Sequence, residues 1–152
     1  MGQGEKAGKY ACFEIERRFL VDALPNGCNQ TCDFVRIRDL YVTGTRLRLR
    51  RMENSAGILL KAKLGRKESV EGRPEEAIMT NLYLEGDEWD LMKASLGGVW
   101  VVKRRYKEVW MGRRWSVDVF EGAHNGLVMA EVEFGRGQAV EIPPVVWPGG
   151  DL

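Results

Sequence analysis

Hydrophobic and charged residues alternate along much of this chain. Such alternation is typical of β-strands, because successive side chains of a strand point to opposite faces of the sheet. It is strictest over residues 45–52, where arginine at every second position is interleaved with leucine. Comparable runs, bounded by segments with glycine, proline or asparagine, predict about eight strands. We expect these strands at residues 11–21, 34–42, 45–52, 58–64, 74–84, 100–108, 114–121 and 127–135.

Other segments predict a helix, a loop and a tail. Residues 87–96 carry leucine on one side, start at Asp87, which can cap a helix, and stop before a pair of glycines, so we predict a helix there. The polar segment 65–72 is predicted to be a mobile loop. Residues 1–10 are polar and contain glycine, so we expect a flexible N-terminal tail followed by a single domain over residues 11–152.

The spacing of these elements defines the expected fold class. Turn-forming residues at 53–57, 112 and 124–126 join neighbouring strands as hairpins, and residues 22–29 form a longer loop. The predicted fold is mainly β, with little helix. Short strands joined in this way suit either an up-and-down barrel or a meander sheet.

The overall composition excludes several partners. Lysine and arginine number 23 against 22 acidic residues, so the net charge of +1 lacks the basic field that nucleic-acid binders carry. The N-terminus has no apolar core of a signal peptide, and no stretch reaches the length of a transmembrane helix. We therefore expect a cytoplasmic protein without a membrane partner. Cys12, Cys28 and Cys32 are an odd number without a zinc-type ligand cluster, which predicts free thiols.

Charges of the same sign share strand faces. Residues two apart lie on one face, and the sets are Glu14 and Glu16, with Arg18; Arg46, Arg48 and Arg50; Lys61 and Lys63; Lys103 and Arg105; Glu131 and Glu133. A water-facing sheet surface also alternates, and this is the simpler interpretation of any single strand. Such a surface usually mixes signs, whereas these faces are nearly pure in sign. Taken together, they indicate a binding cavity.

The two kinds of face suit the two parts of a metal–polyphosphate complex. Carboxylate oxygens are ligands for Mg²⁺ or Mn²⁺, and arginine and lysine bind phosphate oxygens. The motifs of P-loop enzymes, serine hydrolases, zinc proteases and kinases are absent from the sequence. The one histidine, His124, lies in a predicted turn, where a catalytic role is not expected. These observations indicate metal-activated water rather than a nucleophilic side chain.

Six segments, in order, resemble the signature strands of the CYTH superfamily, also called triphosphate tunnel metalloenzymes. The segments are EIERRFLV at 14–21, LRLRR at 47–51, LKAK at 60–63, KRRY at 103–106, WSVDVF at 115–120 and AEVE at 130–133. The resemblance extends over nearly the whole chain and is strongest to the small bacterial inorganic-triphosphatase-like members. It implies a closed, eight-stranded antiparallel β-barrel, the tunnel, with a few flanking helices. Members include inorganic and thiamine triphosphatases, class IV adenylate cyclases and RNA triphosphatases.

The resemblance also implies roles for individual residues. It implies hydrolysis of inorganic triphosphate, or a related short polyphosphate, with two Mg²⁺ or Mn²⁺ ions. The implied metal ligands are Glu14, Glu16, Asp118, Glu131, Glu133 and Glu75. Asp118 and Glu131 are also the implied catalytic residues, because they help to hold the ion that activates water. The implied substrate-binding residues are Arg18, Arg48, Arg50, Lys63, Lys103 and Arg105, with Arg46 and Lys61 on the same faces. The expected partner is a small-molecule triphosphate, and a homodimer stays open as an assembly.

The chain departs from the family pattern in three places. Arg18 stands where the signature has lysine, and Glu75 and Glu76 are adjacent where the family has carboxylates two residues apart. Adjacent residues of a strand face opposite ways, so one of these two would face away from the tunnel. The chain also ends at Leu152, earlier than the resemblance leads us to expect, which indicates either a tunnel more open at one end or a sequence trimmed at its C-terminus.

Other functions stay open. One is a nucleotide or thiamine triphosphatase, or a class IV-type adenylate cyclase, in which Trp100, Trp110 or Trp115 would stack on a ring of the substrate. Packing of these residues on the barrel is the simpler interpretation. Another, of a different class, is a non-catalytic polyphosphate-binding module, which the departures at Glu75 and Glu76 and at the C-terminus favour.

Overall fold

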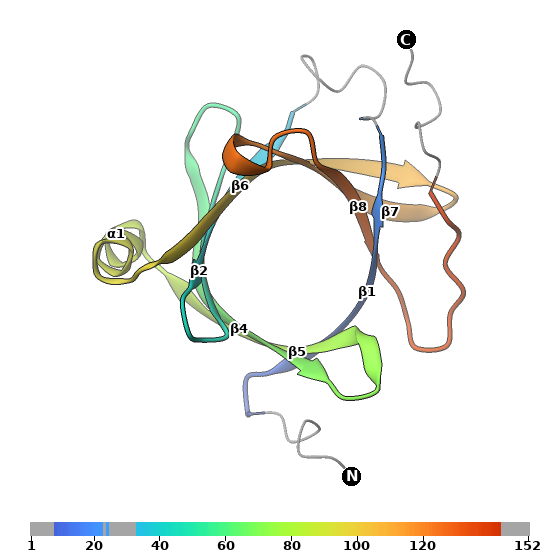
Figure 1. Cartoon of the computed structure of the whole chain (residues 1–152), viewed down its shortest axis with the longest axis horizontal. Coiled ribbons are helices and arrows are strands. Elements are labelled where there is room, and N and C mark those ends of the chain that lie inside the picture. The colour runs from blue at the N-terminus through green and yellow to red at the C-terminus, as the bar shows by residue number, and fades with distance from the viewer. Residues whose placement is uncertain (1–7, 23, 25–32, 144–152) are drawn as a thin grey trace.

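Eight antiparallel strands close into a barrel in the computed structural model, which describes residues 8–22, 24 and 33–143 (Figure 1). Neighbouring strands follow the order β1-β5-β4-β3-β2-β6-β7-β8, and β8 pairs with β1 to close the ring. The strands are β1 (Cys12–Leu20), β2 (Val35–Val42), β3 (Leu47–Glu53), β4 (Leu59–Val70), β5 (Arg73–Leu84), β6 (Gly98–Trp110), β7 (Arg113–Phe120) and β8 (Val128–Glu133). This confirms the predicted mainly β, closed eight-stranded barrel.

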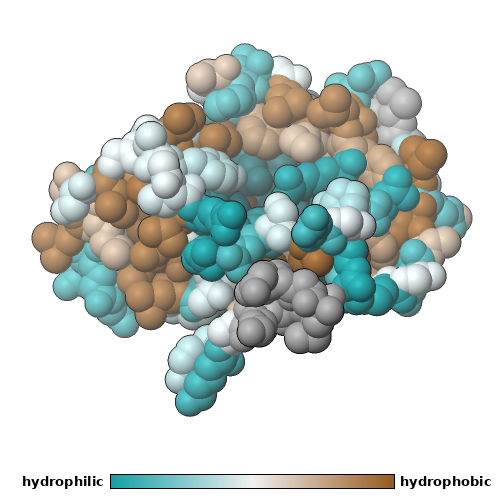
Figure 2. Space-filling view, turned by 60° about the horizontal axis from the view of Figure 1, so that its bottom comes forward, coloured by the Kyte–Doolittle hydropathy of each residue, from teal (hydrophilic) through white to brown (hydrophobic). Residues whose placement is uncertain are grey.

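The barrel has a polar inside, and apolar side chains pack on parts of its outside. Two clusters of buried apolar side chains lie against its outer face. The first joins Leu40, Leu49 and Ala62 of the strands to Trp89 of the helix, and the second is formed by Val21, Trp115, Val117, Ala130 and Val132. The helix α1 (Gly86–Ser95) lies on the outside of the barrel (Figure 1) and covers the first cluster with Trp89. Val140 packs on the second cluster. In the space-filling view, hydrophilic residues gather around the central hollow (Figure 2). The alternation in the sequence therefore points its charged residues inward.

Helix α1 is held at its start by a reciprocal cap. Glu85 is the N-cap residue: its side chain accepts a hydrogen bond from the backbone N–H of Glu88, and the Glu88 side chain accepts one from the Glu85 backbone N–H. The predicted cap, Asp87, was wrong, because the helix begins one residue earlier. Directly after the helix, a Cβ on Gly98 would lie 1.9 Å from the Tyr41 carbonyl oxygen, so only glycine allows β6 to pair with β2 here.

The predicted mobile loop at residues 65–72 was wrong. Strand β4 continues to Val70 and turns at Gly72, which has a φ of 74°. At Gly65 a Cβ would lie 2.9 Å from Oδ1 of Asn81, so a larger residue there would require the Asn81 side chain to shift. The segment is polar because both faces of the strand are polar here: Lys67 points into the barrel, and Arg66 and Glu68 pair with one another outside it.

Some predictions fall wholly or partly on residues 1–7, 23, 25–32 and 144–152, which lie outside the described residues. These concern most of the N-terminal tail, most of the loop at 22–29, the thiols of Cys28 and Cys32, and the end of the chain. Cys12 is a free thiol. In the described part of the chain, no helix has the length and apolar character needed to cross a membrane.

Candidate functional site

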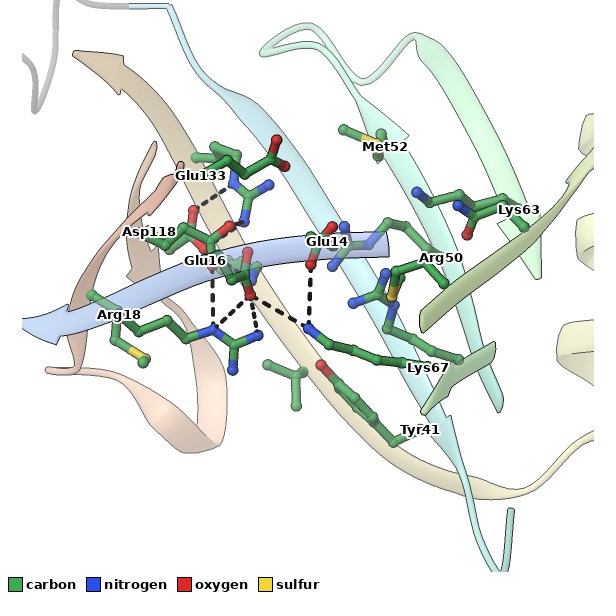
Figure 3. Close-up of a pocket in the computed structure, with 18 of the residues that line it drawn as sticks. Glu14, Glu16, Arg18, Tyr41, Arg50, Met52, Lys63, Lys67, Asp118 and Glu133 are labelled. Carbon is green, nitrogen blue, oxygen red and sulfur yellow. Dashed lines mark hydrogen bonds and ion pairs between the residues drawn. The ribbon is translucent and has the colours of Figure 1, made fainter. Parts of the chain in front are cut away.

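A cavity of about 310 Å³ lies inside the barrel. Every predicted metal-binding and substrate-binding residue except Glu75 lines it, and Figure 3 draws most of them. These are Glu14, Glu16, Arg18, Arg48, Arg50, Lys63, Lys103, Arg105, Asp118, Glu131 and Glu133. All eight strands contribute at least one residue to the cavity wall, because alternation turns every second side chain inward.

One side of the cavity, here called the carboxylate wall, consists of Glu14 and Glu16 of β1, Asp118 of β7, and Glu131 and Glu133 of β8. Glu16 and Glu133 are directly paired across the β1–β8 ladder, and Arg18 is paired with Glu131. Directly paired residues share a face of the sheet, so the closure of the barrel brings these carboxylates together.

Cations of the protein bind most of these carboxylates. Arg105 donates from Nε and Nη2 to both oxygens of Asp118, at 2.7 and 2.8 Å, and from Nη2 to Glu131 Oε1 at 2.8 Å. Lys103 Nζ lies 2.9 Å from Asp118 Oδ2. Burial alone would raise the pKa of Asp118, but the hydrogen bonds and charge of Arg105, with Lys103, hold that pKa below its usual value.

The carboxylates of β1 have cationic partners as well. Arg18 Nη2 donates to Glu16 Oε1 at 2.6 Å, and Lys67 Nζ lies 3.4 Å from Oε1 of both Glu14 and Glu16 (Figure 3). Burial opposes ionisation of Glu16, yet the charges of Lys67 and Arg18 outweigh it and lower the pKa of this carboxyl. Glu133 forms no ion pair within the described residues.

The opposite side, here called the cationic wall, consists of Arg48 and Arg50 of β3 and Lys61 and Lys63 of β4. Among the described residues, its one buried counter-charge is Asp39 of β2, which is fully buried and accepts two hydrogen bonds of 2.7 Å from Arg50. Arg48 Nε lies 4.0 Å from the same carboxylate and, although buried, donates to no acceptor in the described residues. This wall therefore carries an excess of positive charge.

The excess changes the titration of Lys63. Burial, followed by the charges of Arg50, Arg48 and Lys61, lowers the pKa of Lys63 to about 8. Asp39 opposes this shift and only partly offsets it. An anion in the cavity would relieve the repulsion that lowers this pKa.

Glu75 does not reach the cavity, contrary to the prediction. It pairs with Arg17 at 3.0 Å and lines a neighbouring hollow instead. The pairing of β1 with β5 ends at Ile15 and Glu76, so Glu75 lies past the last paired residue. Glu76 turns outward to Arg136, and Ala77 takes the position opposite Glu14.

Other candidates also lie outside the cavity lining. Arg46 pairs with Glu68 at 3.0 Å, whereas Lys61 does line the cavity. The three tryptophans pack on the barrel: Trp110 lies against Trp115 with ring centroids 5.9 Å apart, and Trp100 lies against Trp89 of α1. None of the three lines the cavity, nor does His124.

The structure adds cavity residues that the sequence did not indicate, chiefly Tyr41, Lys67 and Asn81. It also adds Asp39, which does not line the cavity but pairs with Arg50 of its wall. Lys67 was missed because its segment was interpreted as a loop. Asp39 was missed because its partner Arg50 lies on another strand, and only the register of β2 against β3 brings the two together. The one indication in the sequence that Asp39 faces inward was that it shares a strand face with Ile37 and Tyr41, each two residues away.

The carboxylate wall has the donor set for a divalent cation. Five carboxylates line one cavity, and such oxygens are the ligands that Mg²⁺ and Mn²⁺ prefer. In the described residues, no group of three potential ligands is already arranged to hold an ion. The ion pairs explain this, because Lys67, Arg18 and Arg105 occupy carboxylate oxygens that would bind the ion.

Comparison with known proteins gave matches among solved structures. No family model and no curated protein matches the chain. The crystal structure of the inorganic triphosphatase NE1496 matches with a TM-score of 0.56 and 26% identity, covering 88% of this chain and 86% of that chain. The tunnel fold is shared with an inorganic triphosphatase. A second structure of NE1496, described as a hypothetical protein, has the same coverage, with a TM-score of 0.55 and 24% identity. The similarity confirms the resemblance inferred from the six motifs.

Proposed function

We propose that this chain hydrolyses inorganic triphosphate, or a related short linear polyphosphate, inside the tunnel and with a divalent cation. One observation carries the proposal: a wall with excess positive charge faces a wall of carboxylates across a single cavity of about 310 Å³. Polyphosphate needs cations for its oxygens, and a metal that bridges it to the protein needs carboxylates. The similar structure is that of an inorganic triphosphatase, which supports the same substrate class.

The cationic wall would bind the phosphates. Arg50 is held in place by the two hydrogen bonds to Asp39, so part of its conformational entropy is already lost before substrate binds. The buried Arg48 Nε would gain an acceptor, and the Lys63 ammonium would gain a counter-charge. The ordered Arg50 and the gains at Arg48 and Lys63 all favour a multiply charged anion over a neutral ligand.

The carboxylate wall would hold the metal. Glu14, Glu16 and Glu133 would bind one ion, and Asp118 and Glu131 would help to bind a second. A bound Mg²⁺ or Mn²⁺ supplies charge neutralisation at the phosphate oxygens and lowers the pKa of water. Arg105 and Lys103 keep Asp118 ionised, so that its oxygens act as acceptors at neutral pH. Cations around the cavity would offset the charge that builds up on the phosphoryl oxygens during transfer.

A second candidate function is a non-catalytic polyphosphate-binding module. The observation in its favour is that internal cations pair with Glu14, Glu16, Asp118 and Glu131, while Glu75 stays outside the cavity. Such a module would bind triphosphate on the cationic wall and release no phosphate.

The test is phosphate release from triphosphate, ATP and thiamine triphosphate, with Mg²⁺, with Mn²⁺ and with chelator. We expect release from inorganic triphosphate with metal only, and a loss of about 100-fold in the Glu133→Gln variant. Glu71→Gln, in the exposed β4–β5 turn, is the matched control and should behave like the wild type. Calorimetric binding of triphosphate without release under any metal would favour the binding module. Formation of cyclic AMP from ATP would overturn the triphosphatase proposal.

A further inference from the structure

Lys67 brings a positive charge to the centre of the carboxylate wall. It extends from β4 over the intervening strand β5, and its Nζ lies 3.4 Å from Oε1 of Glu14 and 3.4 Å from Oε1 of Glu16 (Figure 3). Both contacts are made by one ammonium group, which thereby occupies the space between two carboxylates. These are the same carboxylates that the proposed function assigns to a divalent cation.

The sequence of β5 explains why an ammonium fills this space. The position of β5 opposite Glu14 is Ala77, and the position opposite Lys67 is Met79. Neither side chain carries a charge, so β5 brings no carboxylate to this part of the wall. The short side chain of Ala77 leaves room beside Glu14, and the long side chain of Lys67 reaches into it.

Two cations cannot share these oxygens at close range. An ammonium within 3.4 Å of both carboxylates lies where a divalent ion would bind them, and the two positive charges would repel each other strongly. A metal can therefore bind Glu14 and Glu16 together only after Lys67 has moved away. Arg18 imposes the same requirement on Glu16, but it does not contact Glu14.

Lys67 is able to move. Its side chain is 36% exposed, and a lysine ammonium on a flexible four-carbon stem reorients more easily than an arginine fork. A triphosphate in the cavity would offer this ammonium several anionic oxygens at once. The chain then loses little when Lys67 exchanges one set of anionic partners for another.

We propose that Lys67 is a substrate-binding residue that keeps divalent cations off Glu14 and Glu16 until triphosphate draws its ammonium away. This inference rests on the proposed function, because it takes the same site and the same anion. It makes the binding of metal and of triphosphate mutually dependent. By linkage, each ligand then raises the affinity of the protein for the other by the same factor.

The first test measures Mn²⁺ binding to the full chain without any anion, by electron paramagnetic resonance of the free ion. We expect Lys67→Met to bind Mn²⁺ about tenfold more tightly than the wild type, because the competing ammonium is gone. Lys61→Met is the matched control: it removes the same charge from the same cavity, but Lys61 contacts neither Glu14 nor Glu16 in the described residues. Its Mn²⁺ affinity should change less than about threefold.

Equal or weaker Mn²⁺ binding by Lys67→Met would overturn the inference, and so would an equal gain in the control variant. A purely structural role for Lys67 predicts weaker binding, since the site would lose its order. If Lys67→Met does not fold, Lys67→Gln is measured in its place, with the same expectation and the same contradicting result.

The second test measures triphosphate binding by calorimetry in the presence of chelator. Lys67→Met should bind triphosphate about tenfold more weakly than the wild type, and Lys67→Arg should retain most of the affinity. Unchanged affinity in Lys67→Met would contradict the substrate-binding role. Each of the two proposals can fail on its own. If the wild type hydrolyses triphosphate but Lys67→Met binds Mn²⁺ as the wild type does, only the role of Lys67 is overturned. The expected Mn²⁺ and triphosphate effects in a chain that releases no phosphate overturn the proposed hydrolysis alone.

Discussion

The two walls of the tunnel differ in how their charge is balanced. On the carboxylate wall, Asp118 receives hydrogen bonds from Arg105 and an ion pair from Lys103. On the cationic wall, Arg48 and Arg50 share the buried carboxylate of Asp39, and Lys61 and Lys63 form no ion pair in the described part of the chain. A balanced buried charge stabilises the fold only while its partner is present. An unbalanced charge gains more when a ligand of opposite charge arrives. We therefore expect charged residues to stabilise the fold on the carboxylate wall and to bind the ligand on the cationic wall.

The largest effect is expected on the balanced wall. Arg105→Met should lower the free energy of unfolding by about 3 kcal/mol, because Asp118 stays buried and loses its bidentate partner. The measurement is urea denaturation of the variant and the wild type at neutral pH. A loss below about 1 kcal/mol would mean that this pair contributes no more than an exposed ion pair.

The corresponding change on the unbalanced wall should act on binding instead. Arg48→Met should weaken triphosphate binding about tenfold, because its buried Nε is available for an anion. The free energy of unfolding should stay the same or rise, since the variant removes repulsion among Arg48, Arg50 and Lys63. Calorimetry and urea denaturation check the two parts. A strong destabilisation with unchanged binding would reverse the contrast between the walls.

The pH dependence of stability sharpens the contrast further. The pKa of Lys63 falls from its ordinary 10.5 to about 8 in the folded chain. Between these values the unfolded chain holds a proton that the folded chain has released. The contribution of Lys63 to the free energy of unfolding therefore rises with pH across this window. We expect Lys63→Met to lose this rise in urea denaturations at pH 8, 9 and 10. Parallel pH curves for variant and wild type would show that Lys63 is not perturbed.

The smallest effect is expected at Glu75, outside both walls. Its pair with Arg17 is exposed, with 46% of the Glu75 side chain accessible, and such pairs contribute about 0–1 kcal/mol. Glu75→Gln should leave phosphate release and Mn²⁺ affinity within about twofold of the wild type. A large loss of Mn²⁺ affinity in this variant would show that Glu75 is a metal ligand, as the resemblance implied.

The alternation of same-sign charges predicted the strands, their charged faces and a binding cavity, whereas the closed barrel and the roles of the cavity residues were implied by the resemblance to the CYTH superfamily. That reasoning needs an apolar opposite face, which Leu47 and Leu49 provide beside Arg48. It failed at Lys67, where both faces of β4 are polar and the strand was interpreted as a loop.

The register between strands that are distant in sequence determines the site features that the sequence did not predict. Asp39 finds Arg50 only through the pairing of β2 with β3. Glu75 misses the cavity because β1 pairs with β5 only as far as Ile15 and with β8 from Glu16 onward. A local pattern of side chains carries no information on where such a change of partner occurs.

The central claim is that the cationic wall binds triphosphate and the carboxylate wall performs its hydrolysis. Steady-state kinetics of phosphate release by Lys63→Met and Glu133→Gln, measured side by side with the wild type, test it most directly. The account predicts that Lys63→Met raises KM about tenfold with kcat nearly unchanged, and that Glu133→Gln lowers kcat about 100-fold. It would be contradicted if both variants changed the same parameter to the same extent, or if the wild type released no phosphate from triphosphate with Mg²⁺ or Mn²⁺.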